Sequence, residues 1–305
     1  MNVAIIDLGS NTIRLSIYSV DQTNRFENLL NKKETVGLAS YIENGSMSEN
    51  GIIRAISTLN RDKTICDGFG IHDIHVIATA PLRNIDNSDY AIERIQKATG
   101  LTIHLLSGEQ EATLDFEGAM LCTDIQDGLL IDIGGGSTEL VCFKDHKILQ
   151  AISLPIGSLL GYTKFFKSLT PTKKQIKALK QHFNELLSVT DFIKTQNTTH
   201  AIGVGGSIRA VNKCFKRSYS LNDNMVLTTK QIKSLYKLIK TMDDDGLNLI
   251  LKSAPDRIHT IISGMTILMV ILDHFDVDDL TISSYGVREG YLYHWLNHRM
   301  EEDHA

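Results

Sequence analysis

Two glycine-containing segments of the chain carry residue types that bind phosphate anions. Residues 7–15 read Asp-Leu-Gly-Ser-Asn-Thr-Ile-Arg-Leu and residues 132–140 read Asp-Ile-Gly-Gly-Gly-Ser-Thr-Glu-Leu, so the two align without gaps at an offset of 125 positions. Backbone N–H groups of a glycine-rich turn can converge on an anion, because no Cβ keeps the anion away. The candidate donors are Ser10, Asn11 and Thr12 in the first segment and Gly134, Gly135, Gly136 and Ser137 in the second. We expect the pair to hold a chain of phosphates from two sides.

Charged side chains occupy equivalent places in the two segments. Asp7 and Asp132 each end an apolar run just before the turn. Two carboxylates beside a phosphate would repel it unless a cation lies between them, and Mg²⁺ prefers such oxygen ligands. Arg14 and Glu139 are also equivalent but opposite in charge. Arg14 could contact a phosphate and Glu139 could position a water or the metal; alternatively, the two form a salt bridge with each other.

Hydrolysis of a phosphate chain also requires a base that orients the attacking water. The helix that we expect over residues 109–120 begins with Glu109 and Glu111. Residues two apart on a helix point about 200° away from each other, so only one of them can face a site. Acids in a first helical turn are also favoured by the helix dipole, and these residues alone do not choose between the two. Arg83 follows the strand expected at 74–78, where either a phosphate clamp or a surface arginine fits.

The elements that must position these residues fall into two similar halves. Each segment lies between two apolar runs, which predicts a β-hairpin that opens each half. In the first half we expect helices at 49–66, 90–99 and 109–120 and strands at 74–78 and 102–106. In the second half we expect strands at 147–154, 200–204 and 280–283 and helices at 171–189, 229–241 and 257–272, with another helix after 204. This order predicts duplicated α/β domains at 1–124 and 125–286, with a terminal helix, 287–305, that returns to the first.

Composition narrows the class of protein. The 305 residues are 42% hydrophobic and 22% charged, as in an ordinary globular protein, and the net charge of −5 argues against a nucleic-acid-binding surface. Any polyanion must therefore meet local positive charge. The most apolar stretch, 258–272, is too short to span a bilayer and no leader is evident, so we expect a cytoplasmic protein with no membrane contact. Four scattered cysteines show no metal-ligand spacing. A run of lysines near helical spacing is interpreted as a solvated helix face: Lys173, Lys174, Lys177 and Lys180.

Six motifs in order along the chain resemble the exopolyphosphatase/guanosine pentaphosphate phosphatase (Ppx/GppA) family in its short two-domain form. They are AIIDLGSNTIRL, ATAPLR, SGEQEA, LLIDIGGGSTELV, GVGGSIRAV and LTISSYGVREGYL. The resemblance implies two duplicated actin-like ATPase (ribonuclease H-like) domains with a cleft between them. It implies Glu111 as the catalytic base, and functional roles for Arg83, Asp132, Gly134, Ser137 and Glu139. The family commonly has TSALR where this chain has Ala80-Pro81, and proline fixes φ, which puts the presentation of Arg83 in doubt.

The resemblance implies an exopolyphosphatase that uses Mg²⁺ or another divalent cation and releases orthophosphate from the end of inorganic polyphosphate. The alternative substrate is guanosine pentaphosphate (pppGpp), which would lose its 5′-terminal phosphate. More distant alternatives are an actin-like ATPase or sugar kinase, and a non-catalytic protein that binds polyphosphate or an alarmone. The segment 203–211 corresponds to the border of the nucleoside pocket in actin-like ATPases, and whether it binds a nucleoside stays open. A homodimer could extend the anion channel.

Overall fold

The structure is a computed structural model that describes residues 1–192, 199–222 and 225–303. The chain divides into two compact units. The first comprises Met1–Glu111 together with Tyr291–Ala305, and the second comprises Ala112–Gly290. Two helices pass from one unit to the other: α4 (Gly108–Met120) near its start and α11 (Val287–Asp303) near its fourth residue.

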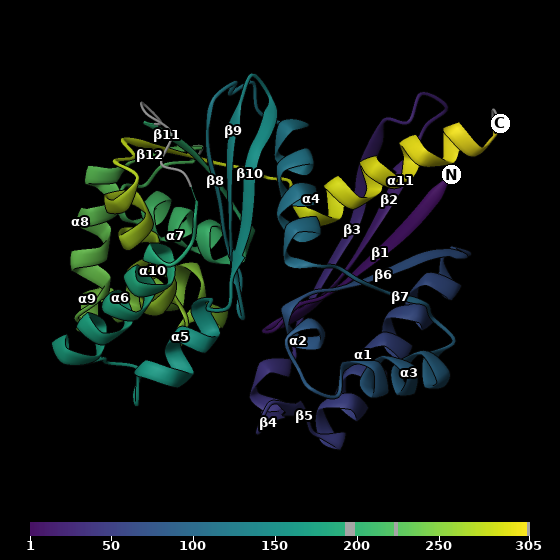
Figure 1. Ribbon diagram of the computed structural model, residues 1–305, viewed down its shortest axis with the longest axis horizontal. Coiled ribbons are helices and arrows are strands. Elements are labelled where there is room, and N and C mark those ends of the chain that lie inside the picture. The colour runs from purple at the N-terminus through teal and green to yellow at the C-terminus, as the bar shows by residue number, and fades with distance from the viewer. Residues whose placement is uncertain (193–198, 223–224, 304–305) are drawn as a thin grey trace. The chain divides into compact units, whose positions relative to one another are not determined.

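The first unit is built on a five-stranded mixed sheet (Figure 1). Its strands are β1 (Asn2–Leu8), β2 (Thr12–Val20), β3 (Phe26–Thr35), β6 (Asp73–Ala78) and β7 (Ile103–Leu105), in the order β3-β2-β1-β6-β7. The first three strands pair antiparallel, whereas β6 and β7 continue the sheet parallel to β1. The carboxyl ends of β1, β6 and β7 therefore meet at one edge.

Helices cover both faces of this sheet. Successive side chains of a strand point to opposite faces, and Ala4, Ile6 and Leu8 share a core with α1 (Glu49–Gly68) and α3 (Ser88–Thr99). Part of α11 packs on the same unit, where the ring of Trp295 lies 4.7 Å from that of His75. Burial and the nearby His104 lower the pKa of His75. Shorter elements complete the unit: η1 (Leu38–Tyr41), β4 (Ile42–Glu43), β5 (Ser46–Met47) and α2 (Ala80–Arg83).

The sheet of the second unit repeats this plan with one added strand. Its strands are β8 (Gly128–Ile133), β9 (Thr138–Lys144), β10 (Lys147–Leu154), β11 (His200–Val204), β12 (Val226–Thr228) and β13 (Asp279–Ile282). The order β10-β9-β8-β11-β13 matches that of the first unit strand for strand, and β12 joins the far edge antiparallel to β13. An antiparallel hairpin followed by parallel strands thus occurs twice.

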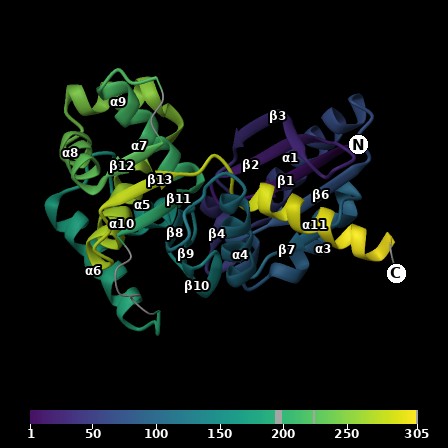
Figure 2. The same cartoon turned by 90° about the horizontal axis from the view of Figure 1, so that it is seen from above.

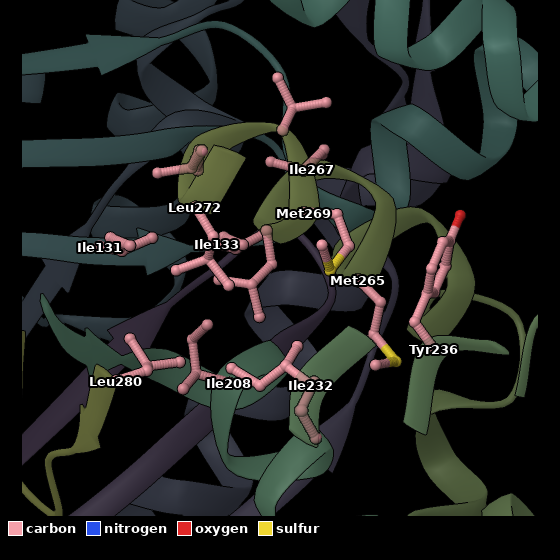
Figure 3. Packing of buried hydrophobic residues seen from close by; sticks show 14 of the residues in the cluster. Ile131, Ile133, Ile208, Ile232, Tyr236, Met265, Ile267, Met269, Leu272 and Leu280 are labelled. Atoms are coloured by element: carbon pink, nitrogen blue, oxygen red, sulfur yellow. The ribbon is translucent and has the colours of Figure 1, made fainter. Parts of the chain in front are cut away.

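The core of the second unit centres on α10 (Ile261–His274), whose residues from Ile261 to Leu272 are all buried. Figure 3 shows Met265 and Met269 among side chains of β8, α7 and α8. The helices around α10 are α5 (Ser158–Phe165), α6 (Lys173–Ser188), α7 (Gly205–Ser218), α8 (Thr229–Ile239) and α9 (Asp244–Ser253), which Figure 2 shows from above.

Glycines allow α4 and α11 to cross within the second unit. A Cβ on Gly118 would lie 2.2 Å from the carbonyl oxygen of Gly286, and one on Gly290 would lie 1.9 Å from that of Leu114. Real Cβ atoms do not come that close to a backbone atom, so this crossing depends on the absence of side chains at these positions.

The predicted fold class, a protein of two duplicated α/β domains, is confirmed by the strand order that the two units share. Several expected helix limits differ from the observed ones by a few residues, and two of these differences have a clear local cause. Helix α6 begins at Lys173 rather than at Pro171, because Thr172 forms a capping box with Gln175. Arg257 lies in a separate 3₁₀ turn, η2 (Pro255–Arg257), ahead of α10. In the part of the chain that the structure describes, no helix combines the length and the apolar character needed to cross a membrane.

Candidate functional site

The turn between β1 and β2 is held from behind by the loop that follows β3. The Ser10 carbonyl accepts a hydrogen bond from the Ala39 N–H (3.0 Å), and the Asn11 carbonyl accepts from Val36 (3.1 Å) and Gly37 (2.9 Å). A trans peptide places its C=O and N–H on opposite sides, and the described backbone has no cis peptide. The N–H groups of Asn11 and Thr12 therefore point away from this loop.

Side chains of the same turn are buried. Ser10 and Asn11 are each 5% exposed. The Nδ2 atom of Asn11 is buried, and no described residue offers it a hydrogen-bond acceptor. A buried donor without an acceptor is costly in a folded protein. An anion at this turn would supply the missing acceptor.

The turn between β8 and β9 has the same arrangement with a different support. The Gly134 carbonyl accepts from both the N–H (2.8 Å) and the Oγ (2.9 Å) of Ser158, and the Gly135 carbonyl accepts from Leu159 (2.9 Å) and Leu160 (3.0 Å). These donors are the otherwise unbonded first N–H groups of α5. By the same peptide geometry, the N–H groups of Gly135 and Gly136 point away from α5. Ser137 is 2% exposed and closes the turn.

Arg83 and Glu111 form a partly buried ion pair at the carboxyl edge of the first sheet. Arg83 Nη1 lies 2.7 Å from Glu111 Oε2 and donates to the Leu106 carbonyl at 3.1 Å. Pro81 does not disturb Arg83, because it lies in the first turn of α2, where its missing N–H is no loss. Glu111 is 8% exposed, whereas Glu109 points to solvent. The structure thus separates two acids that helix geometry alone could not rank.

Asp132 lies in a charged environment that the sequence did not reveal. Gly205, with φ of +79°, passes so close that a Cβ there would lie 1.9 Å from Asp132 Oδ1, and a Cβ on Gly206 would lie 2.2 Å from Arg257 Nη2. Burial raises the pKa of the Asp132 carboxyl, and the positive charge of Arg209 opposes this shift. Arg209 and Arg257 were not among the predicted site residues. The arginine inside the GVGGSIRAV motif was the available signal for Arg209; Arg257 had none.

The remaining predicted residues lie on the hairpins themselves. Strand register pairs Asp7 with Arg14 and Asp132 with Glu139, so each pair shares a face of its sheet. Glu139 is fully buried and accepts a 2.7 Å hydrogen bond from Ser153 Oγ. Arg14 Nη1 donates to Asn31 Oδ1 at 3.2 Å. Each hairpin therefore carries its predicted charges near its glycine turn.

The residues near Asp132 suit a cation that keeps most of its own water. Asp132 Oδ1 is buried, and it has no hydrogen-bond partner among the described residues. Within those residues, no group of three or more His, Cys, Asp or Glu side chains could hold a metal by themselves. Mg²⁺ is commonly bound by one or two carboxylates together with waters and substrate phosphates, so a sparse donor set fits Mg²⁺ better than a metal that needs a full protein cage.

Each of the two duplicated α/β units thus carries a glycine turn whose N–H groups point away from the segment that supports it. This arrangement is typical of α/β proteins that bind phosphate groups. A family model described as the Ppx/GppA phosphatase family matches residues 16–299. The chain belongs to this family, and the resemblance seen in its motifs is thereby confirmed.

Individual relatives cover most of the chain. A bifunctional 3-dehydroquinate synthase/phosphatase of Fusobacterium nucleatum is 30% identical over 92% of this chain and 44% of its own length. A Haemophilus influenzae protein that is named as a provisional exopolyphosphatase is 27% identical over 95% of this chain and 90% of its own. The Ppx-GppA enzyme of Aquifex aeolicus is 28% identical, with a TM-score of 0.76 over 96% of this chain and 98% of that one. The chain thus spans less than half of the first relative and nearly all of the second.

Proposed function

We propose that this protein is an exopolyphosphatase, which transfers the terminal phosphoryl group of inorganic polyphosphate to water and releases orthophosphate. The observation that carries this proposal is the orientation of the two glycine turns. In each of them the carbonyls are bonded from behind, which leaves successive N–H groups for an anion. Family membership and the name of the Haemophilus influenzae relative support the same activity.

In this proposal Glu111 is the catalytic base that orients the attacking water, and Arg83 holds its carboxylate in place. Their 2.7 Å contact and the low exposure of both side chains support a fixed geometry. Charge that develops on the transferred group would be stabilised by backbone N–H groups of both turns and by nearby side chains. The residues proposed to bind phosphate are Ser10, Asn11, Thr12, Arg14, Arg83, Gly134, Gly135, Gly136 and Ser137. Glu139, which belongs to the same phosphate-binding segment, is proposed to position a water or the metal.

Asp7 and Asp132 are the proposed carboxylate ligands of Mg²⁺. A bound Mg²⁺ would neutralise negative charge on the phosphate oxygens. The raised pKa of Asp132 bears on this role, because a proton and the cation compete for the same carboxylate. Arg209 and Arg257 add positive charge beside Asp132, where a phosphate chain needs it.

The test is phosphate release by the purified protein with Mg²⁺ from three substrates in parallel: polyphosphate, pppGpp and ATP. We expect polyphosphate to give the highest kcat/KM. A preference for pppGpp would instead support the alternative substrate, and a preference for ATP would support an ATPase. Binding of polyphosphate without release from any substrate would favour a non-catalytic sensor and overturn the proposal. Cytoplasmic location and a homodimer belong to the same proposal, and cell fractionation and sedimentation of the purified protein test them.

A further inference from the structure

Positive charge is concentrated in one stretch of this acidic chain. Residues 164–240 contain 15 Lys and Arg residues but only three Asp and Glu residues, whereas the other 228 residues contain 16 and 33. A chain of net charge −5 thus includes a segment of net charge +12. The segment belongs to the second unit, and its described residues include the end of α5, the strands β11 and β12, and all of α6, α7 and α8. This separation is much larger than a solvated helix face requires.

Two of these helices each present a row of lysines. Residues three and four apart lie on one face of a helix. On α6, Lys173, Lys177 and Lys180 have this spacing. On α8, Lys230, Lys233 and Lys237 have it too, and Lys240 continues the row just beyond the end of the helix. Like charges at such spacing destabilise a helix. We call these seven residues the lysine surface.

The two rows meet at one aromatic ring. The ammonium groups of Lys180 and Lys240 lie 5.9 and 5.8 Å from the centroid of the Tyr236 ring. Tyr236 is buried, and its hydroxyl makes a 2.7 Å hydrogen bond with Thr266 Oγ1 of α10, which fixes the ring. Both lysines are half-buried. Two cations from separate helices are therefore directed to the same place.

Carboxylates do not neutralise this pair. Lys233 has an ion pair, at 2.8 Å to Asp273. For Lys180 and Lys240, none of the described Asp and Glu side chains lies within 4 Å of the ammonium group. A cavity of about 480 Å³ adjoins Lys177 and Lys180. Its wall also contains Gln181, Asn184, Ser188 and one acid, Glu185, whose carboxylate is not within 4 Å of the Lys180 ammonium group. The cations, their polar neighbours and the open space together form a surface that suits an anion.

We propose that the lysine surface binds the distal part of a polyphosphate chain, away from the end that is hydrolysed. This inference rests on the proposed function, and it adds a second binding region that selects long chains. Lysine offers a point charge to phosphate, whereas base recognition in nucleic acids favours arginine forks and exposed aromatic rings. The segment 164–240 contains 13 lysines and two arginines, and the Tyr236 ring is buried. A phosphate chain without bases is therefore the better match.

The experiment compares the double variant Lys180→Glu/Lys240→Glu with a matched control, Lys144→Glu/Lys147→Glu, which changes two exposed lysines at the β9–β10 turn of the same unit. Binding is measured by fluorescence anisotropy with end-labelled polyphosphate of about one hundred phosphates, and by competition with tripolyphosphate. We expect the first variant to weaken binding of the long chain at least tenfold and to leave tripolyphosphate unchanged. Its salt dependence should also fall, because fewer counterions are released. The control should match the wild type.

Three results would overturn the inference. They are unchanged long-chain binding, equal weakening for long and short chains, and wild-type binding of single-stranded RNA of equal charge as tight as that of polyphosphate. If the double variant does not fold, Lys180→Gln/Lys240→Gln removes the charges without reversing them. Phosphate release from long-chain polyphosphate is measured on the same samples. If the wild type binds long chains through these lysines but releases no phosphate, the proposed function is wrong and the lysine surface stands. If the variant releases phosphate with an unchanged KM, the lysine surface is wrong and the proposed function stands.

Discussion

In both glycine turns the carbonyl groups are hydrogen-bonded from one side, but different segments of the chain provide the donors. In the first, an irregular loop around Gly37 bonds the turn carbonyls, and Ser10 and Asn11 fill the space beside them. In the second, the first turn of α5 provides that support, and the turn itself has no side chain until Ser137. What the two turns share is the direction of their peptide N–H groups. The residues that hold the peptides in that direction differ between the two units.

The charges near the turns differ as well. The edge of the first sheet carries the Arg83–Glu111 ion pair, whereas that of the second carries Asp132 with Arg209 and Arg257. In the proposed function, both turns bind the phosphate chain; in addition, the first unit activates water and the second supplies further positive charge. Four changes, from the largest expected effect to the smallest, test this division of roles.

Glu111→Gln should reduce kcat on polyphosphate by about 10²–10⁴-fold, because the amide cannot act as a base. Binding of polyphosphate should persist, since the turns remain intact. Steady-state phosphate release and anisotropy on the same preparation check both statements. Glu109→Gln is the matched control, as its side chain is exposed in the same helical turn. Full activity of the Glu111 variant together with loss of activity in the Glu109 variant would show that Glu109 is the base.

Gly157→Ala should damage the second turn more than Gly37→Ala damages the first. A Cβ on Gly157 would lie 2.6 Å from the carbonyl oxygens of Gly134 and Ser137, so backbone must move, at a cost of about 3 kcal/mol. A Cβ on Gly37 would meet only Ser40 Oγ, at 3.5 Å, and the cost is about 1 kcal/mol for its φ of +67°. The free energy of unfolding in urea and the KM for polyphosphate are measured for both variants. Equal losses of stability in the two variants would contradict the inference that the two turns are supported differently.

Asp132→Asn should abolish the stabilisation that Mg²⁺ gives to the folded protein. A ligand at one hundred times its Kd stabilises the native state by about 2.7 kcal/mol, which appears as a higher Tm. Because burial raises the pKa of Asp132, protons displace the cation more readily as pH falls. The Mg²⁺-dependent rise in Tm should therefore shrink between neutral and acidic pH in the wild type. An equal rise in the variant at every pH would remove Asp132 from the metal site.

Asn11→Ala should raise KM for polyphosphate about tenfold with little change in kcat, since one hydrogen bond to a charged group contributes about 1.5 kcal/mol. Its buried Nδ2 has no described acceptor, so the folded protein loses little when it is removed. Thermal unfolding without substrate should show this directly. A large loss of stability with an unchanged KM would mean that Asn11 only packs the first turn.

Much of the fold could be predicted because its signals are local. The strands 147–154 and 200–204 were predicted with the limits that the structure gives, since apolar runs with clear boundaries define them. Strand β3 was missed because it is a polar edge strand, in which even Leu29 is exposed. Helix α5 was missed because it has only eight residues, and its position depends on the turn that it supports. Such elements are stabilised by tertiary contacts rather than by their own pattern.

The candidate site shows the same limit. Repetition revealed both glycine turns, but nothing local could place Arg83 beside Glu111, because 28 residues separate them. Arg257 was missed for a related reason. It was assigned to the start of an apolar helix, whereas the chain turns at Pro255 and brings the guanidinium to Gly206. Long-range pairs of charges become visible only when the fold is known.

The glycine crossing of α4 and α11 also has a genetic consequence. A side chain at Gly118 or Gly290 would meet a backbone carbonyl, not a neighbouring side chain that could shrink or turn away. A smaller neighbouring side chain cannot create room for it, because backbone atoms occupy the space. In a mutational scan these glycines should therefore reject alanine in every genetic background, including strongly stabilised ones. Ordinary core positions, by contrast, become permissive as stability rises. We therefore expect glycine to be required at both positions of the crossing.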